Sequence, residues 1–135
     1  MQRIYTYLIL SLTLFIAGCW NTLNFIPKLV EQNKVYYEVN SNTPYTGKAI
    51  SDYPSGVTRH EWSFKDGRKD GAQVSWHANG QKKSETYMKA GELDGADIRW
   101  YKNGKKRNER WFEDGIYVKS KSKYWEESGK LKPSQ

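Results

Sequence analysis

Apolar and polar residues alternate in short runs along most of the chain. From 72 to 77 the small or apolar residues Ala72, Val74 and Trp76 alternate with polar ones, and residues 96–100 repeat the pattern. A period of two is typical of a strand with one half-buried face. Each run is too short and too often interrupted for a helix. We therefore predict a protein built mainly from β-strands.

Turn sequences separate these runs. The letters ANG at 78–80 and KNG at 102–104 contain Asn-Gly, a strong hairpin signal, and a segment rich in Lys and Glu follows each of them. Either a two-residue turn or a three-residue turn with a glycine bulge fits these letters. A change of one residue would move every side chain of the returning strand to the other face, so its register stays open.

The whole pattern recurs every 24 residues. Repeated hairpins predict an all-β fold, a single-layer antiparallel β-meander of about seven to nine strands over residues 34–132. A lone hairpin is marginally stable in water, whereas stacked hairpins share an apolar face, which explains the repetition. Three glycine columns, one acidic column and one basic column keep the period: Gly47, Gly71, Gly95; Gly56, Gly80, Gly104; Gly67, Gly91, Gly115; Glu61, Glu85, Glu109; and Arg59, Lys83, Arg107.

The two ends of the predicted domain are less regular. KVYYEV at 34–39 predicts an extra first strand, and KYWEESGKLK at 123–132 predicts a partial fourth unit that slips by one residue. Residues 19–33 are interpreted as a spacer in front of the domain. A short packed helix over 20–33 is the alternative.

The first 18 residues are typical of a bacterial lipoprotein signal peptide. Arg3 precedes an apolar run over 4–17, which is shorter than the roughly 20 residues of a membrane-spanning helix. IAGC at 16–19 resembles a lipobox, which implies cleavage before Cys19 and lipidation of its thiol. An idle thiol in an uncleaved anchor is the alternative. Acyl chains such as palmitate on Cys19 would hold the exported protein at a membrane, in a Gram-negative cell the outer membrane facing the periplasm.

The predicted strands carry an apolar stripe and two charged columns. Ile50, Val74 and Ile98 are expected to lie beside Trp76 and Trp100 on one face. The basic column precedes the acidic column by two residues, so both are expected on the same face of their strands. They form either a recognition strip or ion-pair ladders on a solvated face. The small contribution of exposed ion pairs, about 0–1 kcal/mol each, favours ladders that only keep the face soluble.

A third column holds Tyr53, His77 and Tyr101. These rings form an aromatic stripe that is either exposed for binding or covered by the spacer or the C-terminal tail. The predicted binding residues come from this column, the basic column and the tryptophans: Tyr53, Trp76, His77, Trp100, Tyr101, Arg59, Lys83 and Arg107.

Residues suited to catalysis do not converge in the sequence. His60 beside Glu61 lacks the spacing of an HExxH metal motif, and no glycine-rich loop leads from a strand into a helix to hold phosphate. No thiol remains for nucleophilic catalysis once Cys19 is lipidated. We predict a protein that is not an enzyme and that uses no cofactor or metal.

The chain is basic, with 22 Lys and Arg against 15 Asp and Glu and a formal net charge of +7. Such a balance suits an acidic partner. Export argues against nucleic acid as that partner. Anionic lipid headgroups and acidic proteins remain.

Residues 44–115 resemble the bacterial variant of the MORN repeat, named for the membrane occupation and recognition nexus. The repeat units in this range share a glycine start, an aromatic pair, an Asn-Gly turn, a Lys/Glu-rich return strand and a closing Asp-Gly, with departures at Asp52 and Ala90. The resemblance implies a repeat sheet used for binding, and bacterial members include YwqK-type antitoxins. It therefore suggests an immunity or antitoxin protein that binds a toxin, and it implies no catalytic residue. The alternative is a structural lipoprotein that binds anionic lipid or cell-wall polymer.

Overall fold

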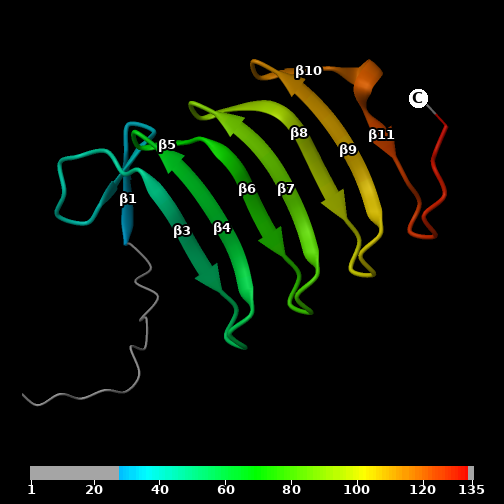
Figure 1. The fold of residues 1–135 in the computed structure, drawn as a ribbon, viewed down its shortest axis with the longest axis horizontal. Helices are drawn as coiled ribbons and strands as arrows, with labels where there is room; N and C mark the ends of the chain where they lie inside the picture. Colours follow the sequence, from blue (N-terminus) through cyan, green and yellow to red (C-terminus); the bar gives the residue numbers. More distant parts are fainter. Residues whose placement is uncertain (1–27, 134–135) are drawn as a thin grey trace, which may run out of the picture.

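The computed structural model describes residues 28–133. Most of these residues form one nine-stranded antiparallel sheet with the strand order β10-β9-β8-β7-β6-β4-β3, in which β5 also pairs with β4 and β11 with β9 (Figure 1). The predicted all-β meander of hairpins is confirmed. The predicted signal peptide over 1–18 and the lipidated Cys19 lie outside the described residues. The strands of the sheet are β3 (Gly47–Asp52), β4 (Thr58–Lys65), β5 (Arg68–Lys69), β6 (Gly71–Trp76), β7 (Lys82–Lys89), β8 (Glu92–Trp100), β9 (Lys106–Glu113), β10 (Ile116–Tyr117) and β11 (Lys123–Tyr124).

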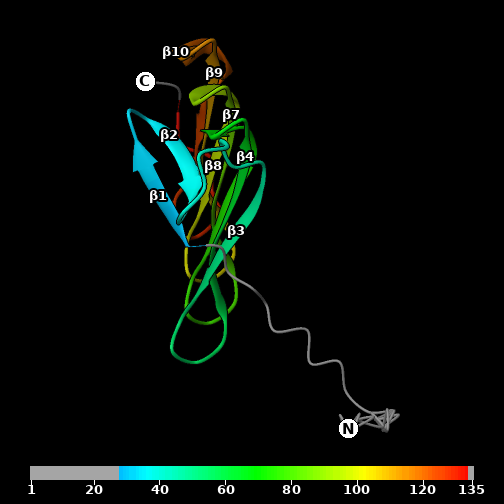
Figure 2. The same cartoon turned by 90° about the vertical axis from the view of Figure 1, so that its left-hand side faces the viewer.

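A separate hairpin precedes the sheet. Its strands β1 (Leu29–Gln32) and β2 (Val35–Glu38) pair only with each other, and the hairpin stands to one side of the sheet when the sheet is seen edge on (Figure 2). The predicted strand over 34–39 is therefore present, but it does not extend the main sheet. Strand β1 also lies within the range 19–33 assigned to a spacer, so the last residues of that range belong to the folded part.

The hairpin is fastened to the end of the sheet through Tyr36. Its backbone N–H donates to the carbonyl oxygen of Gly67 at 2.7 Å, and its carbonyl oxygen accepts from the N–H of Tyr45 at 2.8 Å. The Tyr36 and Phe64 rings lie 4.9 Å apart. Phe64 is one of three buried apolar residues in the described part, together with Ala49 and Phe112. The core is small because one layer of sheet buries little on either side.

The Asn-Gly turns are three-residue turns with a glycine bulge. The carbonyl oxygen of His77 accepts from the N–H of Gly80 at 2.9 Å, and the N–H of His77 donates to the carbonyl oxygen of Gln81 at 2.8 Å. Gly80 has a φ of 81°, the left-handed conformation that this turn requires. Of the two turns that the sequence left open, the longer one is present, and it sets the first pair of each returning strand, such as Trp76 with Lys82.

The closing turns are two-residue loops of the other hairpin kind. In the middle unit Lys89 pairs with Glu92, and the two residues between them have positive φ, 51° at Ala90 and 95° at Gly91. Positive φ at both positions defines a type I′ turn, which matches the twist of the strands. Asp-Gly occupies the equivalent turns at 66–67 and 114–115.

Aromatic rings tie each unit to the next. The Tyr53 hydroxyl donates to the carbonyl oxygen of Trp76 at 2.9 Å, and the Tyr101 hydroxyl donates to that of Trp125 at 3.0 Å. Between these two bonds, Nε2 of His77 lies 3.3 Å from the carbonyl oxygen of Trp100. The bond to Trp125 shows that the partial fourth unit packs as the earlier units do.

Candidate functional site

Directly paired residues place Ile50, Val74 and Ile98 in one row with the acidic column. Ile50 pairs with Glu61, Glu61 with Val74, and the alternation continues to Glu109. Paired residues of an antiparallel sheet lie on the same face. The expected apolar stripe is therefore interrupted by a glutamate at every second position.

Each of these glutamates is paired with a lysine, but not with the predicted basic column. Glu61 binds Lys48 at 2.6 Å, Glu85 binds Lys82 at 2.7 Å, and Glu109 binds Lys106 at 2.8 Å. The expectation that Arg59, Lys83 and Arg107 share a face with the glutamates is corrected by the register.

A bulge in each returning strand is the physical reason. Lys82 pairs with Trp76 and Ser84 pairs with Ser75, so Lys83 is an extra residue with no partner across the ladder. Arg59 and Arg107 are the extra residues of the equivalent bulges. An extra residue breaks the alternation of faces, so counting by twos along the strand gives the wrong face.

The row next to the glutamates alternates tryptophan and lysine. Lys82 Nζ lies 5.4 Å from the centre of the Trp100 ring, and Lys106 Nζ lies 5.7 Å from that of Trp125. All three tryptophans are half-buried. We call this surface the tryptophan–lysine face, made of Trp76, Lys82, Trp100, Lys106 and Trp125. Its lysines are held both by a carboxylate and by an aromatic ring, so the charge of this face is balanced and its side chains are positioned.

Two residues of the predicted basic column, Lys83 and Arg107, line a groove at the ends of the strands. A recess of about 230 Å³ is lined by His77, Lys83, Ser84, Arg99, Trp100 and Arg107. The next unit repeats it, because a second recess of about 290 Å³ shares Arg107 and is lined also by Tyr101, Asn108, Tyr124, Trp125 and Lys132. We call these two recesses together the cationic groove.

The groove carries net positive charge. Among residues 28–133, no carboxylate lies within ion-pair distance of Arg59, Lys83 or Arg107. Arg59 instead lies 5.5 Å from the Tyr53 ring, and Arg107 lies 5.8 Å from the Tyr101 ring. These aromatic contacts hold the cations in place without neutralising them.

Two of these cations affect the pKa of His60. Burial lowers the pKa of His60 below its ordinary 6.5, and the charges of Arg59 and Lys83 lower that pKa further. The imidazole stacks on Trp62 at 4.9 Å, and its Nδ1 lies 3.2 Å from the Ser51 hydroxyl.

The eight predicted binding residues therefore fall on two surfaces. Trp76 belongs to the tryptophan–lysine face, whereas His77, Tyr101, Lys83 and Arg107 line the cationic groove. Trp100 contributes its ring to the former and also lines the latter. Tyr53 and Arg59 contact each other beside the equivalent position of the first unit.

Sequence reasoning missed Arg99, Ser84 and the buried carboxylate of Asp97. Asp97 is only 2% exposed and accepts hydrogen bonds from the Thr86 hydroxyl at 2.8 Å and from Nε of Arg110 at 2.9 Å. One feature of the sequence could have indicated the Asp97 site. Asp97 lies one residue from Ile98 and therefore faces away from the apolar row. Without the register, its partner on the next strand was not identifiable.

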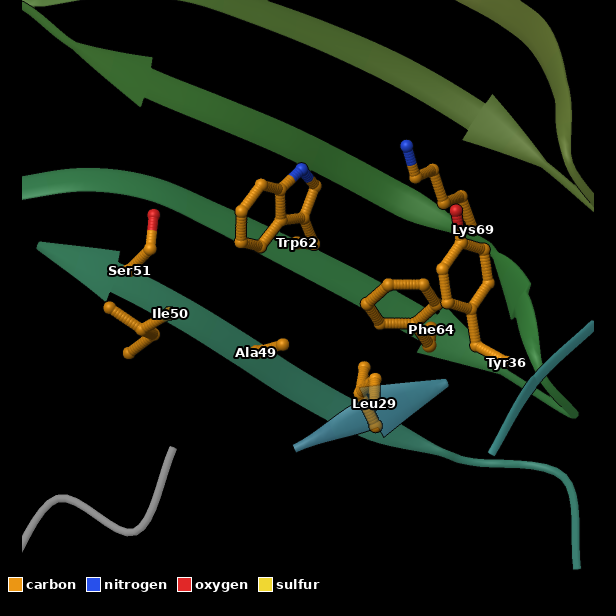
Figure 3. Close-up of a pocket in the computed structure, with 8 residues that line it drawn as sticks. All are labelled: Leu29, Tyr36, Ala49, Ile50, Ser51, Trp62, Phe64 and Lys69. Atoms are coloured by element: carbon orange, nitrogen blue, oxygen red, sulfur yellow. The ribbon is translucent and has the colours of Figure 1, made fainter. Parts of the chain in front are cut away.

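A further recess of about 340 Å³ lies where the hairpin meets the sheet. Leu29 and Tyr36 approach it from the hairpin, Trp62 and Phe64 from β4, and three residues from β3 (Figure 3). Its lining is mostly apolar, with Lys69 as its one charged side chain.

The part of the chain that the structure describes contains no group of three His, Cys, Asp or Glu residues placed to hold a metal ion. Within that part there is also no helix with the length and apolar character needed to cross a membrane. Comparisons with family models, curated proteins and solved structures found no match for this chain.

Proposed function

We propose that this protein is a non-enzymatic binding module, held at a bacterial membrane by acyl chains on Cys19, that binds another protein through the tryptophan–lysine face. The observation that carries the proposal is the arrangement of Trp76, Lys82 and Trp100. Both tryptophans are half-buried, and the lysine between them is held by Glu85 at 2.7 Å.

Such a surface is suited to the centre of a protein interface. Tryptophan is enriched there, because it buries a large area with little loss of side-chain freedom, and unpaired charge is depleted. Here the lysines are already paired, so covering them leaves no single charge without a partner. The first hairpin contacts Phe64, which lies three residues from Glu61 along β4 and therefore on the other face of the sheet, so the tryptophan–lysine face is accessible to a partner.

An immunity or antitoxin role is the concrete form of this proposal. It rests on the resemblance of the repeats to bacterial MORN-type antitoxins, in which the partner would be a toxin. In that role the tryptophan–lysine face would cover a surface that the toxin needs for its activity.

Co-purification tests the partner. The full chain, solubilised in mild detergent from its native host, is expected to retain one protein at near-stoichiometric yield in moderate salt. Lys82→Glu is expected to lose that protein, because it places an unpaired acid beside Glu85 and between two tryptophans. Lys83→Glu is the matched control, since it makes the same charge change one residue away on the groove side.

Two outcomes contradict the proposal. One is the absence of any stoichiometric protein from the wild-type preparation. The other is loss of the partner in Lys83→Glu with retention in Lys82→Glu, which would assign binding to the groove.

The anchor is tested separately with Cys19→Ser. This variant is expected to stay folded and to move from the membrane fraction to the soluble fraction. Cys19 is the only cysteine of the chain, so its replacement removes the thiol to which the acyl chain would be attached. Circular dichroism of the soluble protein checks the fold. Continued fractionation with membranes would contradict the lipid anchor.

A further inference from the structure

The cations of the groove recur once per unit in equivalent positions. Arg59, Lys83 and Arg107 occupy the same bulge in three successive hairpins, and Lys132 lines the last recess. Lys82 and Lys106, which precede two of these cations in the chain, are paired with glutamates, and so is Lys48 on β3. Within the described residues, these three lysines are thus neutralised, whereas Arg59, Lys83 and Arg107 have no carboxylate within ion-pair distance.

The spacing of this row follows from the sheet. Equivalent strands lie two apart, so equivalent cations lie about 9–10 Å apart, twice the distance between neighbouring strands. Aromatic and imidazole rings at Tyr53, His77 and Tyr101 stand along the same row, one per unit. A ligand that follows the row therefore meets a cation and a flat ring at each step.

The spacing of the cations suits some linear anions better than others. Phosphates of a nucleic acid strand recur at closer intervals, about 3.4 Å along a duplex, so most of them would find no cation here. A carboxylate on every second sugar of a linear polysaccharide recurs at about the length of a disaccharide, which is close to the spacing of the cations. The flat face of an intervening sugar suits the His77 ring, which lines the first recess, whereas Arg59 and Arg107 lie over one face of the Tyr53 and Tyr101 rings.

We propose that the cationic groove binds a linear acidic polysaccharide that carries one carboxylate per disaccharide, with successive carboxylates on Lys83 and Arg107 and with Arg99 between them. Arg99 is the weaker contact, because its Nε already lies 3.7 Å from the carboxylate of Asp97. This site lies on the side of the sheet that carries Lys83, Ser84 and Arg99, and it shares Trp100 and Trp125 with the tryptophan–lysine face. It does not depend on the proposed protein partner.

The experiment titrates hyaluronan oligosaccharides of increasing length into the full chain in detergent, with isothermal calorimetry as the readout. Binding is expected to strengthen with length until the oligosaccharide spans the two recesses, and to weaken as salt rises, because the contacts are ionic. Lys83→Gln and Arg107→Gln are each expected to weaken binding about fivefold, the effect of losing one cation at an anionic ligand.

Matched controls are the lysines that precede these two residues. Lys82→Gln and Lys106→Gln remove the same charge from the other face, and each is expected to leave affinity for the oligosaccharide unchanged within about twofold, since the charge removed lies away from the ligand. Thermal unfolding checks that all four variants fold.

Three results would overturn the inference. Equal losses in the Lys82 and Lys83 variants would mean that only net charge matters. Equal binding of neutral dextran would mean that the cations are irrelevant. Tighter binding of single-stranded DNA or of phosphatidylserine vesicles, lost in the Lys83 variant, would assign the groove to phosphate. Because the partner test uses Lys82→Glu and this one uses Lys83→Gln, failure of either proposal leaves the other standing.

Discussion

Asp97 and Arg110 face each other across β8 and β9, and both oxygens of the carboxylate are occupied, one by the Thr86 hydroxyl and the other by the Arg110 guanidinium. The Asp97 side chain is 3% exposed, whereas that of Arg110 is 32% exposed. The arginine therefore covers a buried charge on an otherwise open sheet.

Removing this cover is expected to cost stability. Arg110→Met should lower the free energy of unfolding by about 2–3 kcal/mol, because the buried Asp97 charge is left with the Thr86 hydroxyl and with the more distant Arg99, whose Nε lies 3.7 Å away. Adding Asp97→Asn should recover about half of that loss, since the neutral amide still bonds to Thr86. Urea denaturation measures both variants. If the double variant is no more stable than Arg110→Met, the uncovered Asp97 charge is not the cause of the lost stability.

The docking of the N-terminal hairpin depends on the absence of a side chain at Gly67. A Cβ there would overlap Val35 and lie 2.9 Å from the carbonyl oxygen of Tyr36, whereas at Gly91 nothing lies within 4 Å of an added Cβ. Both glycines have positive φ, 73° at Gly67 and 95° at Gly91, so alanine strains the backbone at both positions. Gly67→Ala is expected to be less stable than Gly91→Ala by about 2 kcal/mol in urea denaturation. Equal losses would show that the hairpin contributes nothing to the stability of the sheet.

Ala90 is the one position in a closing turn where the chain uses a residue poorly suited to it. Its φ of 51° is left-handed, and the equivalent residues are Asp66 and Asp114. Ala90→Asn is expected to stabilise the protein by about 0.5–1 kcal/mol, because asparagine adopts this conformation at lower cost. Ala78→Asn, outside the positive-φ positions, should change stability by less than about 0.5 kcal/mol. Calorimetric melting of the two variants compares them directly, and no gain at 90 would contradict the assignment of strain.

His60 should make the protein sensitive to mild acid. The pKa of His60 is lowered in the folded state, so the unfolded chain binds the proton more readily. The stability that neutral His60 contributes is therefore present above about pH 6.5 and declines as the pH falls below that value. The free energy of unfolding is expected to fall over this range in the wild type and to fall less in His60→Gln. Arg59→Gln should show an intermediate slope, since it removes one of the charges that lower the pKa. Identical slopes in wild type and His60→Gln would place the acid sensitivity elsewhere.

Much of the fold could be predicted from particular residues. The alternation around Val74, the Asn-Gly turn at 79–80 and the glycines every 24 residues predicted the hairpins, and the structure confirms them. The hairpin at 29–38 was only half predicted. Its second strand had the right pattern, but whether a strand joins a sheet or packs beside it depends on contacts such as that between Tyr36 and Gly67, which are far apart in sequence.

The candidate surfaces could be predicted only in part, for a related reason. The eight residues occupy equivalent positions in successive units, but their faces were assigned by counting in twos along each strand. One extra residue at Lys83 and its equivalents invalidates that count.

Local geometry can be predicted from the sequence, because side-chain alternation and positive φ depend on residues that are neighbours in the chain. The sequence by itself thus determined the strands, the turns and the period. Tertiary structure decided the partners of Glu85 and Asp97, the separation of Lys82 from Lys83, and the side on which the first hairpin rests. These depend on which hydrogen bonds two strands form with each other, and a bulge shifts that pairing without leaving a separate mark on either strand alone.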